Sequence, residues 1–216
     1  MKSEITVLRF GGRRLPRPLG SLRCREIDAS PSIGGSLDEA IRDARRVVVI
    51  GDDADLAAVL SRLLRTDRLD IEVAYPGGRP GNWFSARRAV RGRARRVPLI
   101  RDDTGTVLVG SALWLPPEGA TLLHGEAVVD DIVLFDGHVP GVRIEPTTTL
   151  PGLRARVLGA GLRASVLGSR KRAWVTGRAA QLGTTGVRVV RDGVPGKREV
   201  KRSTFYRHTT GWLRVG

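Results

Sequence analysis

Several residue types are scarce in this chain of 216 residues, and each scarcity excludes a class of protein. Cys24 is the only cysteine, so the chain can form neither an internal disulfide nor a cysteine zinc cluster. No apolar stretch approaches the roughly 20 residues of a membrane-spanning helix, and residues 1–7 lack the long apolar region of a signal peptide. The sequence therefore indicates a soluble cytoplasmic protein. Hydrophobic residues still make up 41% of the chain, which is enough for a core and excludes a disordered tail.

Acidic residues are also scarce in two long segments. The formal net charge of the chain is +15, and its distribution along the sequence is more informative than its size. Residues 79–101 contain eight arginines and no acid, and residues 151–216 contain 15 basic and 2 acidic residues. Residues 102–150 show the reverse, with 1 basic and 8 acidic residues. Such segregation favours an anionic partner, and a phosphorylated metabolite, an anionic lipid surface and nucleic acid all qualify. Compositional bias explains why arginines outnumber lysines 33 to 4, but it explains less well why acids are missing from the same stretches.

Apolar periodicity predicts an α/β layer up to about residue 96. Residues 13–35, rich in proline, glycine, arginine and serine, are interpreted as loop. A helix is expected to start at Ser36, because Ser36 and Glu39 have the spacing of a capping box. The remaining predicted elements are strands over 5–10, 47–50 and 71–75, a helix over 56–66 and a short basic helix over 83–90.

After residue 96, short β-prone runs separated by turn residues predict an antiparallel sandwich or barrel. These runs are 106–109, 131–135, 141–144, 172–176, 186–190 and 212–215. The expected organisation is therefore a nucleotide-binding-like α/β domain over residues 1–96 and a mostly β domain over residues 97–216.

A glycine and three acids follow the predicted strand at 47–50 and precede the predicted helix at 56–66. In open α/β sheets, ligands bind where strands end and helices begin. Gly51 allows close backbone approach, and the helix N-terminus offers unpaired N–H groups to a phosphate. Asp52, Asp53 and Asp55 are candidates to hold Mg²⁺, which would bridge to phosphate oxygens. The alternative is that Asp53 or Asp55 simply caps the helix.

The loop at 76–82 contains three glycines, two prolines and Asn82 just before the basic helix. Glycines such as Gly78 let backbone amides face an anion, and Asn82 could donate to a phosphate or a ribose hydroxyl. The alternative is an ordinary connection with Asn82 as N-cap. Neither a P-loop nor a Gly-x-Gly-x-x-Gly fingerprint occurs in the chain.

The basic run from Arg79 to Arg101 contains Trp83 and Phe84. Arginines with interleaved aromatics can bind single-stranded nucleic acid or lie on an anionic membrane surface. Residues 197–202 can do the same. The oligomeric state is left open, with a homo-oligomer as one possibility.

Three segments together resemble the diacylglycerol kinase catalytic-domain family of bacterial lipid kinases, which is related to NAD kinases. Residues 47–60 resemble the family's strand, Gly-Gly-Asp-Gly-Thr turn and helix. Residues 76–86 resemble its Pro-x-Gly-Thr-x-Asn-Asp-Phe-Ala segment, and residues 176–215 resemble its closing β region with Asp-Gly-Glu. The resemblance implies an NAD-kinase-like α/β domain, an antiparallel β-sandwich domain, and a nucleotide in the cleft between them.

The same resemblance implies a reaction in which the ATP γ-phosphate passes to a lipid hydroxyl such as that of diacylglycerol, with Mg²⁺. It assigns Asp192 as general base and Asp53 as the central acid beside the metal. Asp52 is a second metal candidate on the ground of the acidic turn alone. Nucleotide-binding positions are Gly11, Gly12, Gly51, Asp52, Asp53, Gly78 and Asn82, where Gly11 and Gly12 stand for the family's shortened N-terminal loop.

The motifs also depart from the family. The acidic turn keeps Gly51 and Asp53 but has Asp52, Ala54 and Asp55 where the family has two glycines and a threonine. Asp192-Gly193 is followed by Val194 instead of Glu, and on its own this dipeptide is most simply a hairpin turn. Three hypotheses follow. The first is a divergent lipid kinase whose basic patches dock it on the membrane surface. The second is an inactive family member that binds a nucleotide, an anionic lipid or a protein, and the third is a nucleic-acid-binding protein.

Overall fold

The structure, a computed structural model, describes residues 5–27, 33–76, 83–159 and 173–216. The chain divides into two compact units. Unit 1 holds Met1–Val97 together with Thr210–Gly216, and unit 2 holds Pro98–Thr209. The break after Val97 lies beside the boundary expected from the sequence, but the chain crosses back into unit 1 for its last residues.

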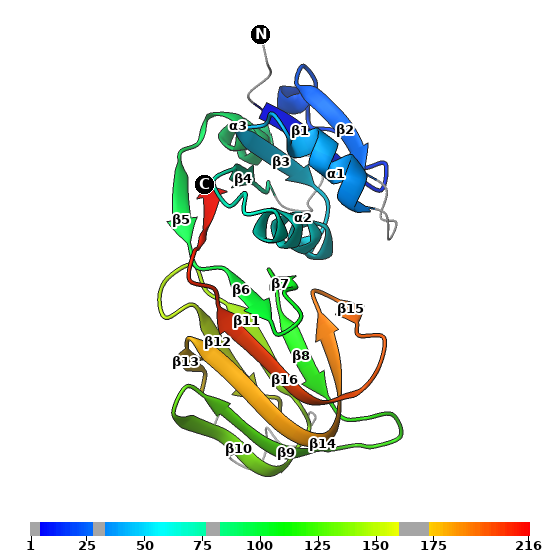
Figure 1. Cartoon of the computed structure of the whole chain (residues 1–216), viewed down its shortest axis with the longest axis vertical. Helices are drawn as coiled ribbons and strands as arrows, with labels where there is room; N and C mark the ends of the chain where they lie inside the picture. The colour runs from blue at the N-terminus through cyan, green and yellow to red at the C-terminus, as the bar shows by residue number, and fades with distance from the viewer. Residues whose placement is uncertain (1–4, 28–32, 77–82, 160–172) are drawn as a thin grey trace. The chain divides into compact units, whose positions relative to one another are not determined.

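Unit 1 is built on one mainly parallel sheet (Figure 1). Its strands are β1 (Ile5–Phe10), β2 (Arg23–Ile27), β3 (Arg46–Ile50), β4 (Glu72–Ala74), β5 (Ala94–Val97) and β17 (Trp212–Val215). The spatial order is β2-β1-β3-β4-β17-β5, and every pair is parallel except β17 with β5. Parallel strands buried on both faces need continuous apolar runs, and the fully buried Val47, Val48 and Val49 of β3 meet that need.

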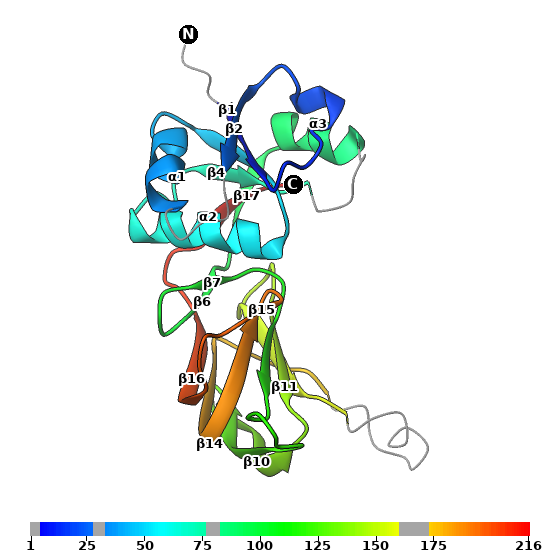
Figure 2. The ribbon, with the colours of Figure 1, turned by 90° about the vertical axis from the view of Figure 1, so that its right-hand side faces the viewer.

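Helices cover both faces of this sheet: α1 (Ile33–Ile41) and α2 (Asp53–Arg65) lie on one side, and α3 (Trp83–Arg91) lies on the other (Figure 2). The 3-10 turn η1 (Arg17–Leu19) packs beside α3, where Leu19, Ala86 and Ala89 share a core with Val48. On α2 the apolar stripe predicted from the sequence is buried, namely Leu56, Val59, Leu60 and Leu63. Among the described residues, none of the helices is long and apolar enough to cross a membrane.

Two local predictions in this unit are wrong. The first helix begins at Ile33, so Ser36 lies inside it and does not cap it; Glu39 instead pairs with Arg25, at 3.8 Å. Residues 13–35 are not simply a loop, because they include η1 and β2. Strand β2 shows no apolar alternation, since Ile27 is its only buried residue, and it is held at the sheet edge by parallel pairing with β1.

The strand at 212–215 is placed differently from the sequence expectation. Its short, β-prone sequence resembles the runs before it and predicts a strand of the β-rich region. In the structure it is β17, inserted between β4 and β5 of unit 1. No local pattern encodes the sheet that this strand joins, because that depends on which sheet offers unpaired strand edges where the chain returns.

Unit 2 is an antiparallel β structure. Each of the other predicted β runs coincides with or overlaps one of its strands. These strands are β6 (Ile100–Asp102), β7 (Val107–Leu108), β8 (Ala112–Leu115), β9 (Leu123–Val129), β10 (Ile132–Val139), β11 (Val142–Pro146), β12 (Leu153–Val157), β13 (Val175–Gly177), β14 (Ala179–Arg191), β15 (Val194–Pro195) and β16 (Val200–Arg207).

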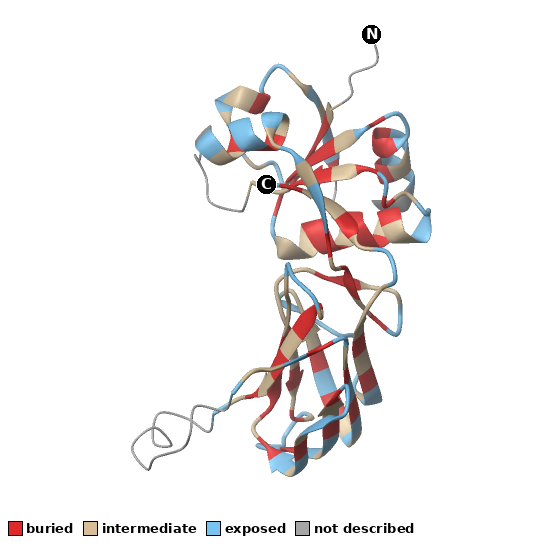
Figure 3. Ribbon diagram, turned by 90° about the vertical axis from the view of Figure 1, so that its left-hand side faces the viewer, coloured by how far each residue is buried: buried red, intermediate tan, exposed pale blue. Residues whose placement is uncertain are grey.

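The long strand β14 is shared by two layers. Its first half pairs with β9 and β16, and its second half pairs with β8, which leads on to β11, β12 and β13. Buried and exposed residues alternate along these strands (Figure 3), as expected for sheets with one face on a core. Trp114 and Phe205 lie in that core with ring centroids 6.1 Å apart, and Trp114 Nε1 donates to Ser203 Oγ at 2.9 Å. The predicted α/β domain plus β-sandwich is therefore confirmed.

Candidate functional site

The candidate site of unit 1 is the edge of the sheet where the parallel strands end. Strand β1 is followed by Gly11 and Gly12, β3 by Gly51 and the acidic turn, and β4 by Tyr75. Because β1, β3 and β4 are parallel neighbours, their carboxyl ends meet at this edge. The sequence prediction that the acidic turn lies at a strand-to-helix junction is confirmed.

The turn after β1 depends on its two glycines. Gly11 and Gly12 have φ angles of +60° and +62°, a left-handed conformation that glycine adopts without steric cost. The turn directs Arg13 toward the acidic turn, where its Nη2 lies 3.3 Å from Asp52 Oδ2. Both side chains are well exposed, so this ion pair contributes little stability.

Asp52 is the N-cap of α2. Its Oδ1 accepts from the backbone N–H of Asp55 at 3.0 Å, and Asp55 Oδ2 accepts from the N–H of Asp52 at 2.9 Å. This reciprocal capping box satisfies two helix N-terminal donors that would otherwise face a ligand or water. The predicted cap was Asp53 or Asp55, whereas the cap itself is Asp52 and Asp55 completes the box.

Gly51 is required by this capping box. A Cβ at residue 51 would collide with the carboxylate of Asp55, which occupies the space that the missing side chain leaves. The pKa of Asp55 is raised, first because the carboxyl is partly buried and also because the Asp52 charge is close. The open backbone expected at Gly51 is thus covered by the chain's own carboxylate.

Asp53 is held by the next strand. Tyr75 Oη donates to Asp53 Oδ1 at 3.1 Å, and the pKa of Tyr75 is raised because burial and the Asp53 charge both disfavour a phenolate. Together with Arg13 and Asp52, this pair ties the ends of β1, β3 and β4 together. Sequence reasoning did not single out Tyr75 or Arg13, since neither pairing follows from local spacing.

The acidic turn does not fit a magnesium ion well. Asp52 uses Oδ1 for the helix cap and Oδ2 for Arg13, Asp55 accepts the Asp52 amide, and Asp53 accepts from Tyr75. Within the described parts of the chain, no group of three His, Cys, Asp or Glu side chains is arranged to hold a metal. The assignment of Asp52 and Asp53 as metal ligands stays a prediction, and these contacts argue against it. Gly78 and Asn82 lie outside the described residues.

Arginines gather at the same edge of the sheet. A cavity of about 290 Å³ is lined by the ends of β4 and β17, the start of β5 and one face of α3. Arg95 and Arg214 lie opposite each other on β5 and β17, and Arg88 reaches the cavity from α3. Among the described residues, no acid lines the cavity and none of these arginines has an acidic partner. Like charges directly opposite on paired strands are destabilising. An anion bound between the arginines would relieve this repulsion, so the arrangement is suited to an anionic ligand.

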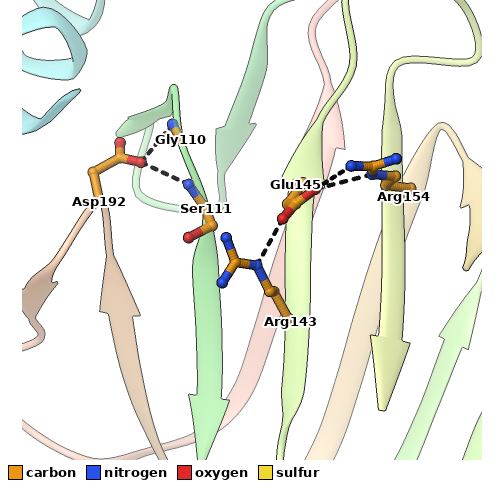
Figure 4. A network of polar contacts seen from close by, with 6 residues as sticks. All are labelled: Gly110, Ser111, Arg143, Glu145, Arg154 and Asp192. Atoms are coloured by element: carbon orange, nitrogen blue, oxygen red, sulfur yellow. Dashed lines mark hydrogen bonds and ion pairs between the residues drawn. The ribbon is translucent and has the colours of Figure 1, made fainter. Parts of the chain in front are cut away.

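Asp192, the expected general base, belongs to unit 2 (Figure 4). Its carboxylate binds the backbone of residues 109–111, and we call this set of hydrogen bonds the Asp192 clasp. Its Oδ1 accepts from the N–H groups of Gly110 and Ser111 at 2.7 and 3.0 Å, and its Oδ2 accepts from Val109 at 3.1 Å. Its own N–H donates to the Ser111 carbonyl at 2.9 Å. A carboxylate has about four acceptor sites, and backbone groups take three of them. Its role as a base stays a prediction, and the geometry favours a structural role at the hairpin end.

A second polar network lies close to this clasp in unit 2 (Figure 4). Glu145 on β11 accepts from Arg143 Nε at 2.7 Å, and its other oxygen accepts from Arg154 Nε and Nη2 at 2.9 and 2.6 Å. Burial acts to raise the pKa of Glu145, but the two arginines together outweigh it and hold the pKa below its usual value.

No protein-family model matches the sequence, and no curated protein does either. Solved structures do match. A diacylglycerol kinase from Bacillus anthracis strain Sterne superposes with a TM-score of 0.68 at 12% identity, covering 100% of this chain and 97% of that one. The chain has the fold of the NAD and diacylglycerol kinases.

NAD kinases share this fold with the chain. An NAD kinase from Archaeoglobus fulgidus in complex with ATP superposes with a TM-score of 0.63 at 12% identity, covering 98% of this chain and 93% of that one. Yeast NADH kinase in complex with NADH gives 0.60 at 10% identity, covering 99% and 83%. The resemblance drawn from three degenerate motifs is thus confirmed at the level of the fold.

Proposed function

We propose that this protein binds a phosphate-bearing ligand at the carboxyl edge of the unit 1 sheet and does not transfer a phosphoryl group through Mg²⁺ at the acidic turn. The observation that carries the proposal is the cavity lined by Arg88, Arg95 and Arg214, three arginines without an acidic partner among the described residues. Arginine donates two parallel hydrogen bonds to phosphate and keeps its charge at all working pH values.

ATP and ADP are the first candidates for the ligand. A structural neighbour, the Archaeoglobus fulgidus NAD kinase, was solved in complex with ATP. Ligands of open α/β sheets lie beyond the carboxyl ends of the strands, and the cavity is bordered by the ends of β4 and β17. The fold and the charge therefore point to the same edge.

Loss of phosphoryl transfer is inferred from the acidic turn. Phosphoryl transfer relies on positioning and on neutralising charge at the phosphates. Here Asp55 fills the space over Gly51, Asp52 is paired with Arg13, and Asp53 is paired with Tyr75. These contacts engage each of the three carboxylates, which disfavours binding of a metal that would neutralise the phosphates. Without that metal, three carboxylates close together would repel the phosphates.

Calorimetric titration of ATP and ADP, each with Mg²⁺ and with EDTA, tests the proposal. We expect binding that does not require Mg²⁺ and that weakens about tenfold in Arg95→Ala and in Arg214→Ala, since each loses a charge-assisted hydrogen bond. Arg65→Ala is the matched control, because Arg65 is an exposed arginine of the same unit outside the cavity. Asp53→Asn should bind at least as well as the wild type.

The opposite pattern would restore the lipid-kinase hypothesis. Binding that requires Mg²⁺ and disappears in Asp53→Asn would place the phosphates at the acidic turn, and a screen of lipid acceptors would then follow. Binding of neither nucleotide at millimolar concentration would reject a nucleotide ligand. Equal weakening by Arg65→Ala and Arg214→Ala would reject the cavity as the site.

A further inference from the structure

Basic side chains also gather on the outer surface of unit 2, over strands β11 and β12. Along both strands buried residues alternate with half-buried ones, so Arg143, Arg154 and Arg156 point away from the core. Antiparallel pairing places Arg143 opposite Arg156 and Glu145 opposite Arg154. We call this surface, together with Trp174, the arginine face.

Trp174 organises two of these arginines. The guanidinium carbons of Arg154 and Arg156 lie 4.3 and 4.5 Å from the centroid of its ring, a cation–π geometry that holds both planar groups in place. Arg154 is also fixed by two hydrogen bonds to Glu145. Arg156 has no acidic partner among the described residues. The face therefore presents oriented guanidinium groups with only one acid to offset three positive charges.

We propose that the arginine face binds single-stranded nucleic acid. Binding of this kind combines a basic track for phosphates with flat side chains against which bases stack, and arginine planes and indoles serve both needs. Residues two apart on a strand lie about 6.6 Å apart, so Arg154 and Arg156 can meet successive backbone groups of an extended strand. This surface differs from the basic runs at 79–101 and 197–202 that stand out in the sequence.

An anionic membrane is the competing partner, and the apolar residues argue against it. Binding to a membrane surface is strengthened by exposed apolar side chains that enter the acyl boundary, in addition to the attraction of basic residues to anionic lipid. Trp174 is only half-exposed, and the strongly exposed large apolar residues of the described chain lie on other elements, apart from Leu150 in the turn between β11 and β12. One leucine beside three arginines gives little area to insert.

Fluorescence anisotropy with a labelled 20-nucleotide oligo(U) tests the inference on the full chain, over a range of KCl concentrations. Three phosphate contacts predict a slope of about −2 for log affinity against log salt, because single strands contribute about −0.7 per contact. Arg156→Ala should weaken binding about tenfold and reduce the slope by about 0.7. Trp174→Ala should weaken binding about tenfold with the slope unchanged, since stacking is lost and charge is kept.

Matched variants separate this site from general attraction to a basic protein. Arg65→Ala removes the same charge from unit 1 and should leave affinity within about twofold, and Leu150→Ala should leave it unchanged. Arg156→Lys, which keeps the charge but not the planar group, should preserve the slope and still weaken binding; it also guards against a misfolded alanine variant.

Three results would overturn the inference. One is the absence of oligo(U) binding, and another is equal weakening by Arg65→Ala and Arg156→Ala. The third is binding to phosphatidylglycerol vesicles that depends on Arg156, Trp174 and Leu150 while oligo(U) binding does not. The arginine face lies in unit 2 and the phosphate cavity in unit 1, so the outcome is independent of the nucleotide titration.

Discussion

Replacing Arg46 with alanine removes the side chain that joins β3, β4 and the carboxyl end of α3. Arg46 Nε donates to Glu72 Oε2 at 2.7 Å. Its Nη1 donates to the carbonyls of Ala89 and Val90 at 3.1 and 2.6 Å, and its Nη2 donates to the Gly92 carbonyl at 2.9 Å. Carbonyls at the end of a helix lack partners within the helix, so one guanidinium satisfies both this helix end and a carboxylate.

The expected cost of Arg46→Ala follows from burial. The side chains of Arg46 and Glu72 are only 12% and 17% exposed, so water cannot readily replace the lost partner. Breaking such a pair by removing one member costs about 3–5 kcal/mol, because the other charge is left buried. Helix α3, which carries Arg88, and strand β4, which is followed by Tyr75, would loosen together.

Urea unfolding followed by circular dichroism at 222 nm measures this effect, because every helix within the described residues belongs to unit 1. With a slope of about 2 kcal/mol per molar urea, the midpoint should fall by about 2 M. Arg65→Ala should change the free energy of unfolding by less than about 0.5 kcal/mol, as an exposed substitution. Arg46→Ala combined with Glu72→Ala should cost less than the sum of the two single changes, because no charge remains buried alone. A cost below about 1 kcal/mol for Arg46→Ala, or strict additivity, would refute the reasoning.

Three further predictions concern single carboxylates. Because the pKa of Asp55 is raised, its ionisation opposes folding at neutral pH, and Asp55→Asn should raise the melting temperature at pH 7. The gain in melting temperature should shrink as pH falls toward the Asp55 pKa. A gain that stays constant in melting curves between pH 7 and pH 4 would contradict this reasoning. The pKa of Glu145 is lowered, so its ion pairs contribute their full stability above the unfolded pKa of 4.5 and lose it as pH falls from 4.5 through the lowered pKa. Glu145→Gln should melt earlier than the wild type at pH 7, and the difference should shrink as pH falls below 4.5; a difference that stays constant would exclude the ion pairs as the cause. Asp192→Ala leaves three backbone N–H groups without an acceptor and should cost about 2–3 kcal/mol in urea unfolding without changing ATP affinity, whereas an unchanged stability would show that the clasp is not structural.

Much of the fold could be predicted from local patterns. The apolar run at 47–50, the acidic turn and the stripe of Leu56, Val59, Leu60 and Leu63 predicted β3, the junction and α2, because burial of one face and helix capping act over only a few residues. Alternation of apolar residues likewise predicted most of the strands of unit 2. The motif resemblance added the kinase fold, which no single element specifies.

Only the tertiary structure decided which side chains meet. Arg13 with Asp52, Tyr75 with Asp53, and Arg95 with Arg214 are brought together by strand order and register, which join segments far apart in the sequence. His124 and His138, separated in sequence, stack at 4.4 Å for the same reason, since the β9–β10 register places them opposite each other. Residue types and spacing fix local geometry through short-range sterics and hydrogen bonds. Whether a carboxylate is open to a ligand or already satisfied depends on neighbours that only the folded sheet supplies.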